Sequence, residues 1–264
     1  MALPDAALSL AGKEPASPLE QDTAPQVRVQ LWDLPLRLFH WSLLTAVGTA
    51  VVTGQIGGDW MSVHGIAGVV TVGLIAFRLT WGLIGSTPAR FTQFAPTPAK
   101  ILAYLQGRWR GIGHNPLGAL SVFALLGVLA FQSVSGLFSN DDIAFTGPLA
   151  GLVTDELSHA LTNWHHQVAN ILLGLLALHV VAIVFYVRVK KDKLVRPMVT
   201  GWKTVPADLP RPRPARPIAL IVALSVGAGA AYAASGIWIP QQPAPEPTQK
   251  VNANHASQGS TPAW

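Results

Sequence analysis

Residues 165–179 read His-His-Gln-Val-Ala-Asn-Ile-Leu-Leu-Gly-Leu-Leu-Ala-Leu-His, an apolar stretch with histidine at both ends. His165 and His179 are 179 − 165 = 14 positions apart. On an α-helix, this separation is a rise of about 21 Å and a rotation about 40° short of four full turns. Both imidazoles therefore lie on one face, one near each side of a bilayer with a hydrocarbon core about 30 Å thick. Polar side chains inside a membrane are costly and by default mark function. This spacing suits two metal centres, one above the other.

The composition around this stretch is that of a membrane protein. Hydrophobic residues make up 50% of the 264-residue chain and charged residues only 12%, which is unusual for a soluble domain. Five apolar runs reach the ~20 residues that a membrane span requires: 38–56, 63–84, 117–138, 160–187 and 217–239. Lipid forces every backbone polar group to pair internally. The sequence therefore predicts an all-α integral membrane fold.

Basic residues predict the orientation of the spans. The 85–113 connection carries four Lys or Arg and the 188–216 connection nine, whereas the turn at 57–62 and the loop at 139–159 carry acids instead. By the positive-inside rule, we expect a cytoplasmic N-terminus and a periplasmic C-terminus. The net charge of +5 is then a signal of topology and does not point to nucleic acid. The absence of cysteine excludes covalent c-type haem, cysteine-ligated iron–sulfur clusters, thiolate-ligated haem and disulfides.

Proline, glycine and polar clusters divide the chain further. Residues 1–30 lack an apolar core and are expected to be a disordered cytoplasmic arm. Asn115-Pro116 predicts the start of the third span, and Thr162 or Asn163 is expected to cap the fourth. Residues 206–216 are proline-rich and predict an extended cytoplasmic linker. A fifth, small-residue span at 217–239 follows, and 240–264 is expected to be a disordered periplasmic tail.

Four histidines fall at two matched depths. His40 begins the first span and His179 lies toward the cytoplasmic end of the fourth, while His64 and His165 lie near the outer face. Each pair comes from two different helices, as axial ligation of a haem within a helical bundle requires. We expect a four-helix bundle enclosing two non-covalent, bis-histidine b-type haems, with irons roughly 21 Å apart along the membrane normal.

Other polar residues near these pairs have alternative interpretations. Arg78 lies 78 − 64 = 14 residues after His64, at the depth of His40 and His179, where it either pairs with a haem propionate or extends to the headgroups. Arg37 is a weaker propionate candidate. His166 is either a proton carrier or an exposed interfacial residue. His114, His159 and His255 are assigned no ligand role.

The motifs around these residues resemble the bacterial cytochrome b561 family, which includes the b-type subunits of nickel–iron hydrogenases. Residues 32–41, Trp-Asp-Leu-Pro-Leu-Arg-Leu-Phe-His-Trp, resemble its opening signature. Further matches are His64-Gly65, Phe77-Arg78 through Trp81-Gly82, Gly113-His114-Asn115-Pro116, His165 to His179, and Arg196-Pro197-Met198. The resemblance covers about 31–203. It implies a di-haem domain, here bounded at 31–205, that exchanges electrons with quinone through His40, His64, His165 and His179. His166 stands where many members have an acidic residue, and the fifth span goes beyond the four-helix core.

The resulting functional hypothesis is a cytochrome b of the bacterial inner membrane that carries single electrons between the quinone/quinol pool and a redox partner. The partner is either a periplasmic c-type cytochrome, which the acidic outer loop would attract, or a hydrogenase or other dehydrogenase subunit. A homodimer is left open, as is whether the chain is itself part of an oxidoreductase. The alternatives are a transporter that moves protons or metal through intramembrane histidines and an assembly subunit without electron transfer.

Overall fold

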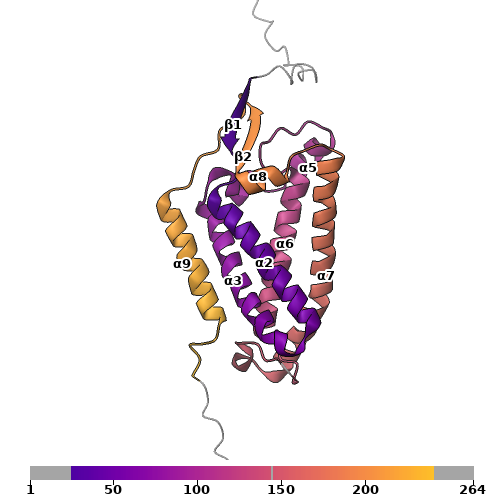
Figure 1. Cartoon of the computed structure of the whole chain (residues 1–264), viewed down its shortest axis with the longest axis vertical. Helices are drawn as coiled ribbons and strands as arrows, with labels where there is room; N and C mark the ends of the chain where they lie inside the picture. The colour runs from indigo at the N-terminus through magenta and orange to yellow at the C-terminus, as the bar shows by residue number, and fades with distance from the viewer. Residues whose placement is uncertain (1–24, 144, 241–264) are drawn as a thin grey trace, which may run out of the picture.

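The structure, a computed structural model, describes residues 25–143 and 145–240. Most of the expected arm at 1–30 and tail at 240–264 lies outside the described residues. Five long helices run side by side (Figure 1), and each is long and apolar enough to cross a membrane: α2 (Leu34–Ile56), α3 (Met61–Ile84), α6 (Pro116–Leu137), α7 (Asp155–Arg188) and α9 (Pro217–Ala234). The chain is a multi-pass membrane protein, as the sequence predicted.

Short elements connect these helices. A 3-10 turn, η1 (Gly58–Trp60), links α2 to α3. Between α3 and α6 lie η2 (Thr87–Ala89), α4 (Phe91–Phe94) and α5 (Pro98–Leu105). The 3-10 turn η3 (Ala150–Leu152) precedes α7, and α8 (Val195–Thr200) follows it. None of these elements is long enough to span a bilayer, so they belong to the two ends of the bundle.

Side-chain caps fix where the long helices begin. The Asn115 side chain accepts a hydrogen bond from the Gly118 amide at 2.7 Å, with proline at the first helical position of α6, as predicted. The expected cap of the fourth span is wrong. Thr154 caps α7, and Thr162 lies inside the helix with its hydroxyl donating to the Ser158 carbonyl at 2.8 Å. Hydropathy missed the start because the first two turns of α7 are polar.

The long helices pack unevenly. Helix α3 lies against α2, α6 and α9, and α7 lies along α6. Within the described residues, the backbone of α7 approaches α2 and α3 at isolated points at most. Near mid-bundle, Val47, Ile75, Leu129 and Leu172, from four different helices, form a buried apolar cluster. On either side of this cluster, the backbone of α7 stays apart from those of α2 and α3.

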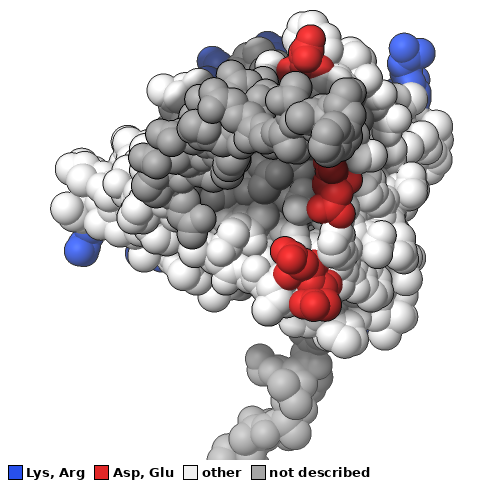
Figure 2. Space-filling model, turned by 90° about the horizontal axis from the view of Figure 1, so that it is seen from below, with Lys and Arg blue, Asp and Glu red and all other residues white. Residues whose placement is uncertain are grey.

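The two ends of the bundle differ in charge. The basic end holds the starts of α2, α6 and α9 and the connections between them, which carry Arg90, Lys100, Arg108, Arg110, Lys190, Lys191, Lys193, Arg196, Lys203, Arg211, Arg213 and Arg216. The acidic end holds η1 and the loop before α7, with Asp59, Asp141, Asp142, Asp155 and Glu156. Figure 2 shows Asp and Glu side chains gathered on the acidic face and Lys and Arg visible only at its margin.

A small antiparallel sheet at the basic end was not predicted. Strand β1 (Gln26–Gln30) pairs with β2 (Trp202–Pro206), with Gln26 opposite Pro206 and Gln30 opposite Trp202 (Figure 1). The amides of Leu31 and Trp32 continue the pairing by donating to the Gly201 carbonyl, at 2.8 and 3.1 Å. Residues 26–30 are therefore a strand, and the prediction of disorder is wrong for them.

Helix α9 lies on the outer side of α3 (Figure 1). The contact is close because both helices carry glycine there: a Cβ on Gly73 would be 3.0 Å from the Gly227 carbonyl oxygen and 2.9 Å from Ala231 Cβ. Small residues of this kind let membrane helices approach closely. The preceding residues 207–216 form no helix or strand, and the Thr87 amide holds this linker by donating to the Arg213 carbonyl at 3.0 Å.

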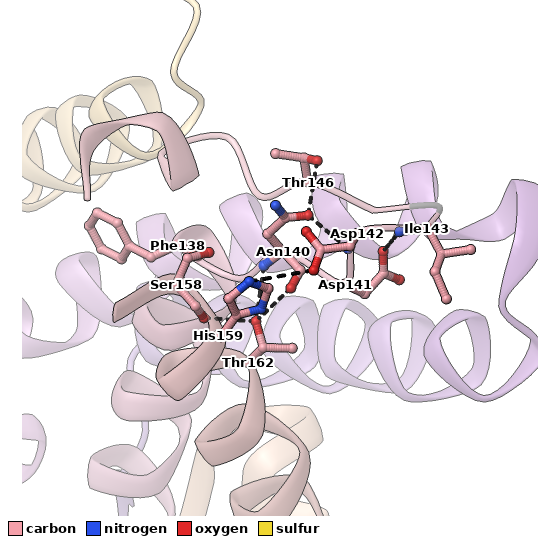
Figure 3. Close-up of polar contacts among 9 residues, drawn as sticks. All are labelled: Phe138, Asn140, Asp141, Asp142, Ile143, Thr146, Ser158, His159 and Thr162. Atoms are coloured by element: carbon pink, nitrogen blue, oxygen red, sulfur yellow. Dashed lines mark hydrogen bonds and ion pairs between the residues drawn. The ribbon is translucent and has the colours of Figure 1, made fainter. Parts of the chain in front are cut away.

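The loop between α6 and α7 at the acidic end is fastened to α7 (Figure 3). The Asp141 carboxylate accepts from the amides of Ile143 and Phe145, at 3.0 and 2.9 Å. The Asn140 amide donates to the Thr162 hydroxyl at 3.0 Å. Nε2 of His159 lies 3.4 Å from the Asp142 carboxylate. These bonds order the loop and tie it to α7 at the acidic end of the bundle.

Candidate functional site

A cavity opens inside the acidic half of the bundle. Residues of α2, α3, α6, α7 and the 138–154 loop line it. Its lining includes the apolar side chains of Val47, Leu129 and Leu172, together with Asp141 and Phe145 of the loop. Two of the predicted ligands, His64 and His165, line this cavity from α3 and α7. The cavity therefore lies between α7 on one side and α2 and α3 on the other, where the backbones of these helices stay apart.

His64 and His165, here called the acidic-end pair, face each other across this space. Their ring centroids are 6.1 Å apart, and the ring planes are nearly perpendicular at 83°. Two metal–imidazole bonds of about 2 Å each, plus the two ring radii, add to roughly 6 Å. The separation of the two rings thus suits one metal atom held between them.

Hydrogen bonds select the nitrogen that each ring presents. Nδ1 of His64 lies 2.8 Å from the Ala50 carbonyl oxygen on α2. Nδ1 of His165 lies 2.9 Å from the Gln132 carbonyl oxygen on α6. A carbonyl oxygen only accepts, so each Nδ1 carries the hydrogen and each Nε2 keeps its lone pair. Such second-shell bonds orient the imidazoles that bind metals, and here both rings are set to donate through Nε2.

A glycine on the neighbouring helix makes room for each ring. A Cβ on Gly54 would stand 2.9 Å from Nδ1 of His64, and a Cβ on Gly136 would stand 2.9 Å from Cε1 of His165. Each glycine comes four residues after the carbonyl that its histidine contacts, Ala50 before Gly54 and Gln132 before Gly136. The same carbonyl-and-glycine arrangement therefore holds both members of the acidic-end pair.

The other two predicted ligands, His40 and His179, form the basic-end pair. They come from α2 and α7 and lie within electrostatic range of each other. Nδ1 of His179 is 3.4 Å from the Ser121 hydroxyl on α6. The structure thus brings His40 near His179 and His64 near His165, at two levels of the bundle.

Arg78 is buried near the basic-end pair. Only 2% of its surface is exposed, so its side chain does not extend out to the headgroups. Its Nη1 donates to the Ala89 carbonyl at 3.2 Å, and its guanidinium lies 4.5 Å from the Phe91 ring centroid. Arg37, the second propionate candidate, has a buried Nε with no hydrogen-bond partner. Nη1 of Arg37 lies beside Gly201, where a Cβ would be 2.6 Å from it.

The remaining histidines divide as follows. His166 is exposed, lines the mouth of the acidic-half cavity, and has its ring centroid 6.2 Å from that of His165. His159 belongs to the loop contact with Asp142. His114 is held inside the basic end, within electrostatic range of Arg78, His40 and His179. The sequence reasoning gave His114 no role, because a lone histidine before a helix cap carries no sign of its surroundings.

Sequence reasoning also missed the residues that position the rings. Nothing in the linear pattern joins Ala50 and Gly54 to His64, or Gln132 and Gly136 to His165, since these contacts cross between helices. One signal does exist in the sequence: each of the two flanking helices carries a glycine close to the depth of the ligand on the next helix. Glycine weakens a helix interior by roughly 1 kcal/mol relative to alanine, which marks these positions as sites of close approach.

The long apolar helices bring together two pairs of imidazoles, and in the acidic-end pair both Nδ1 atoms are bonded to backbone carbonyls. This arrangement is typical of a membrane-bound haem protein of the cytochrome b type. The family model of the prokaryotic cytochrome b561 matches residues 31–201, and the chain belongs to this family. As a b-type cytochrome it carries haem b and takes part in electron transport.

Individual relatives agree with this assignment. The chain is 27% identical to a "Probable Ni/Fe-hydrogenase B-type cytochrome subunit" of Azotobacter vinelandii, over 72% of this chain and 95% of the relative. It is 21% identical to a "Probable Ni/Fe-hydrogenase 1 B-type cytochrome subunit" of Escherichia coli (strain K12), over 70% and 95%. A protein of Rhodobacter capsulatus with the Azotobacter description is 27% identical, over 68% and 83%. No solved structure matches the chain.

Proposed function

We propose that this chain binds two b-type haems, each through two histidines, and moves single electrons along the membrane normal. His64 and His165 hold one haem at the acidic end, and His40 and His179 hold the other at the basic end. The observation that carries the proposal is the acidic-end pair: two rings 6.1 Å apart, both with Nδ1 bonded to a backbone carbonyl. These hydrogen bonds leave both Nε2 atoms available to a metal atom between the two rings.

Haem b supplies a one-electron iron couple, and filling both axial positions favours electron transfer over oxygen binding. The residues of the chain fix this chemistry by geometry. His165 and His179 share α7 and are separated by 14 residues, about 21 Å of helix rise. The two histidine pairs would therefore hold two one-electron centres at a separation set by α7.

The partners of this electron transfer follow from the relatives. Because those proteins are described as Ni/Fe-hydrogenase cytochrome subunits, we propose a hydrogenase or other dehydrogenase subunit as one partner. A periplasmic c-type cytochrome is the alternative to it, and the quinone pool is proposed as the other partner. The acidic face (Figure 2) suits a partner with a basic surface. In a membrane that contains the chain, a quinol analogue should reduce the haem.

The orientation also follows from charge. By the positive-inside rule, basic connections at one end and acidic loops at the other support a proposed orientation in which the basic end, and with it strand β1, faces the bacterial cytoplasm. The 138–154 loop and the C-terminus then face the periplasm. Reporter fusions test this assignment: alkaline phosphatase should be active after residue 143 and inactive after residue 110, and the reverse result contradicts it.

Haem content tests the proposal as a whole. The purified full chain should be red, with a reducible b-type spectrum and two haems per chain. His64→Ala and His179→Ala should each retain one haem, because each removes a ligand of a different pair. His159→Ala is the matched control, since His159 contacts only the acidic loop, and it should retain two. A colourless full chain supports the transporter alternative, and two haems in His179→Ala refutes the pairing.

A further inference from the structure

His114 occupies an enclosed place at the basic end. It immediately precedes Asn115, the cap of α6. Its ring packs against those of Trp32 and Phe94, each with its centroid 4.7 Å from that of the imidazole. Trp32 belongs to the turn between β1 and α2, and Phe94 to α4, so three separate segments fix the position of this imidazole. Such packing leaves the ring little freedom to turn toward other partners.

Two polar atoms in this region are buried without a hydrogen-bond partner: Nδ1 of His114 and Nε of Arg37. Trp32 lies near both residues. Its ring packs on that of His114. Its carbonyl oxygen and Nη1 of Arg37 both lie beside Gly201, at 2.8 and 2.6 Å from the place where a Cβ on that glycine would stand. A buried donor left without a partner costs about 1–3 kcal/mol, and native proteins seldom leave such atoms unpaired. Each of these atoms is therefore open to a ligand that accepts a hydrogen bond.

The surrounding charges specify the kind of ligand. Arg37 and the buried Arg78 supply two positive charges, and Asp33 is the nearby acid, within electrostatic range of Arg78. The Asp33 carboxylate is already occupied, because it accepts from the Leu36 amide at 2.8 Å and from Nε1 of Trp81 at 3.1 Å. Buried positive charge is costly unless it is paired. The site is thus one negative charge or more short of neutrality.

We propose that His114 binds a propionate of the basic-end haem, donating a hydrogen bond from Nδ1 beside the guanidinium groups of Arg37 and Arg78. This inference rests on the proposed function, because it requires a haem between His40 and His179. Both histidines lie within electrostatic range of His114, so its ring lies at the same end of the bundle as that haem site. His114 is a positioning residue for the cofactor and not an axial ligand.

The protonation state of His114 agrees with a neutral donor. Burial, with the nearby Arg78, His40 and His179, lowers the pKa of His114 to about 3. In the absence of an anion the ring is therefore uncharged at neutral pH, with one nitrogen carrying hydrogen. A carboxylate fits this set of donors better than a quinone carbonyl does, since a neutral carbonyl would leave the charges of both arginines unbalanced.

The variant His114→Phe tests the proposal, because phenylalanine keeps the packing between Trp32 and Phe94 and removes the donor. His114→Gln is its counterpart, since the amide restores an N–H. The measurement is a redox titration of the full chain in detergent, followed at the haem bands. Without the donor, more negative charge stays on the propionate. We expect one haem of His114→Phe to be about tenfold harder to reduce, a fall of about 59 mV for one electron.

In the same variant the other haem should keep its potential, which also reports that the bundle has folded. His114→Gln should recover at least half of the shift. If His114→Phe binds two haems with unchanged potentials, the inference is overturned. If the same variant also binds a quinone analogue more weakly, the ring serves a quinone site, and the inference is overturned as well. If His114→Phe loses both haems, the titration of His114→Gln decides: native potentials support a donor role, and loss of both haems overturns it. A wild-type chain with fewer than two haems refutes the proposed function instead.

Discussion

Gly136 on α6 lies directly against His165 on α7, so closely that a Cβ on the glycine would stand 2.9 Å from Cε1 of the imidazole. Four residues earlier on the same helix, the Gln132 carbonyl accepts from Nδ1 of that ring. The two contacts together leave the imidazole one orientation. Gly54 and Ala50 of α2 do the same for His64.

Gly136→Leu should therefore remove the acidic-end haem and keep the basic-end haem, because the added side chain displaces the His165 ring. Gly127→Leu, on the same helix with nothing within 4 Å of the glycine, is the matched control and should retain both haems. Haem content per chain, measured from the reduced spectrum, reads out the result. Equal haem content in the two variants would show that the ring does not depend on this contact.

The cap of α6 should contribute measurably to stability. Asn115→Ala removes the acceptor for the Gly118 amide, and the loss of such a cap costs about 1 kcal/mol. Asn115→Ser keeps an acceptor at this position and should lie within a few tenths of a kcal/mol of the native chain. Chemical unfolding in detergent, followed by helical circular dichroism, checks both values. Identical unfolding of the alanine and serine variants would contradict the role of the side chain.

The hydroxyls of Tyr104 on α5 and Tyr186 on α7 are 2.6 Å apart. Burial and this bond raise the pKa of Tyr104 above its ordinary value of 10. The unfolded chain then loses the proton before the folded chain does, so the stabilisation is complete below pH 10 and is lost as pH rises toward the folded pKa. Tyr104→Phe should be less stable by about 1 kcal/mol at pH 8.

The difference between Tyr104→Phe and the native chain should shrink above pH 10. Thermal unfolding of both proteins between pH 8 and pH 11 measures this convergence. Tyr232→Phe is a matched control at an exposed position of α9 and should track the native chain throughout. A gap that stays constant across this range would argue against the hydroxyl pair as its source.

Helix α9 should be removable without loss of haem. Gly73→Ile places a side chain where the Gly227 carbonyl and Ala231 Cβ now lie within about 3 Å, so α9 should leave α3. Cysteines introduced at positions 77 and 227, where a Cβ on Gly227 would lie 3.1 Å from Cβ of Phe77, should then crosslink less than in the parent chain, while the haem spectrum is retained. Loss of haem together with the crosslink would make α9 part of the cofactor site.

Much of this architecture could be predicted because helices are periodic. The spacing of His165 and His179 fixes their relative depth and face whatever surrounds them, and the apolar runs predicted all five long helices. The start of α7 was placed too late because hydropathy does not register its polar first turns, although Thr154 and the acids after it are an ordinary helix start.

Other features depend on contacts between distant segments and leave no local pattern. The pairing of β1 with β2 joins residues far apart in the chain, and strands of only five residues carry a weak signal even where, as in Gln26–Gln30, polar and apolar residues alternate. The enclosure of His114 needs Trp32, Phe94 and the α6 cap to meet in three dimensions. Gly54 and Gly136 could be seen in the sequence, but the rings they accommodate could not be assigned to them without the packing.

The strands β1 and β2 close immediately outside the segment that the family shares, since the match covers residues 31–201 and the strands are Gln26–Gln30 and Trp202–Pro206. The chain thus enters the segment that holds the histidine-bearing helices directly after β1 and leaves it directly before β2, and these two strands pair with each other. Segments before β1 or after β2, including α9, are attached outside this strand pair and do not interrupt the histidine-bearing helices.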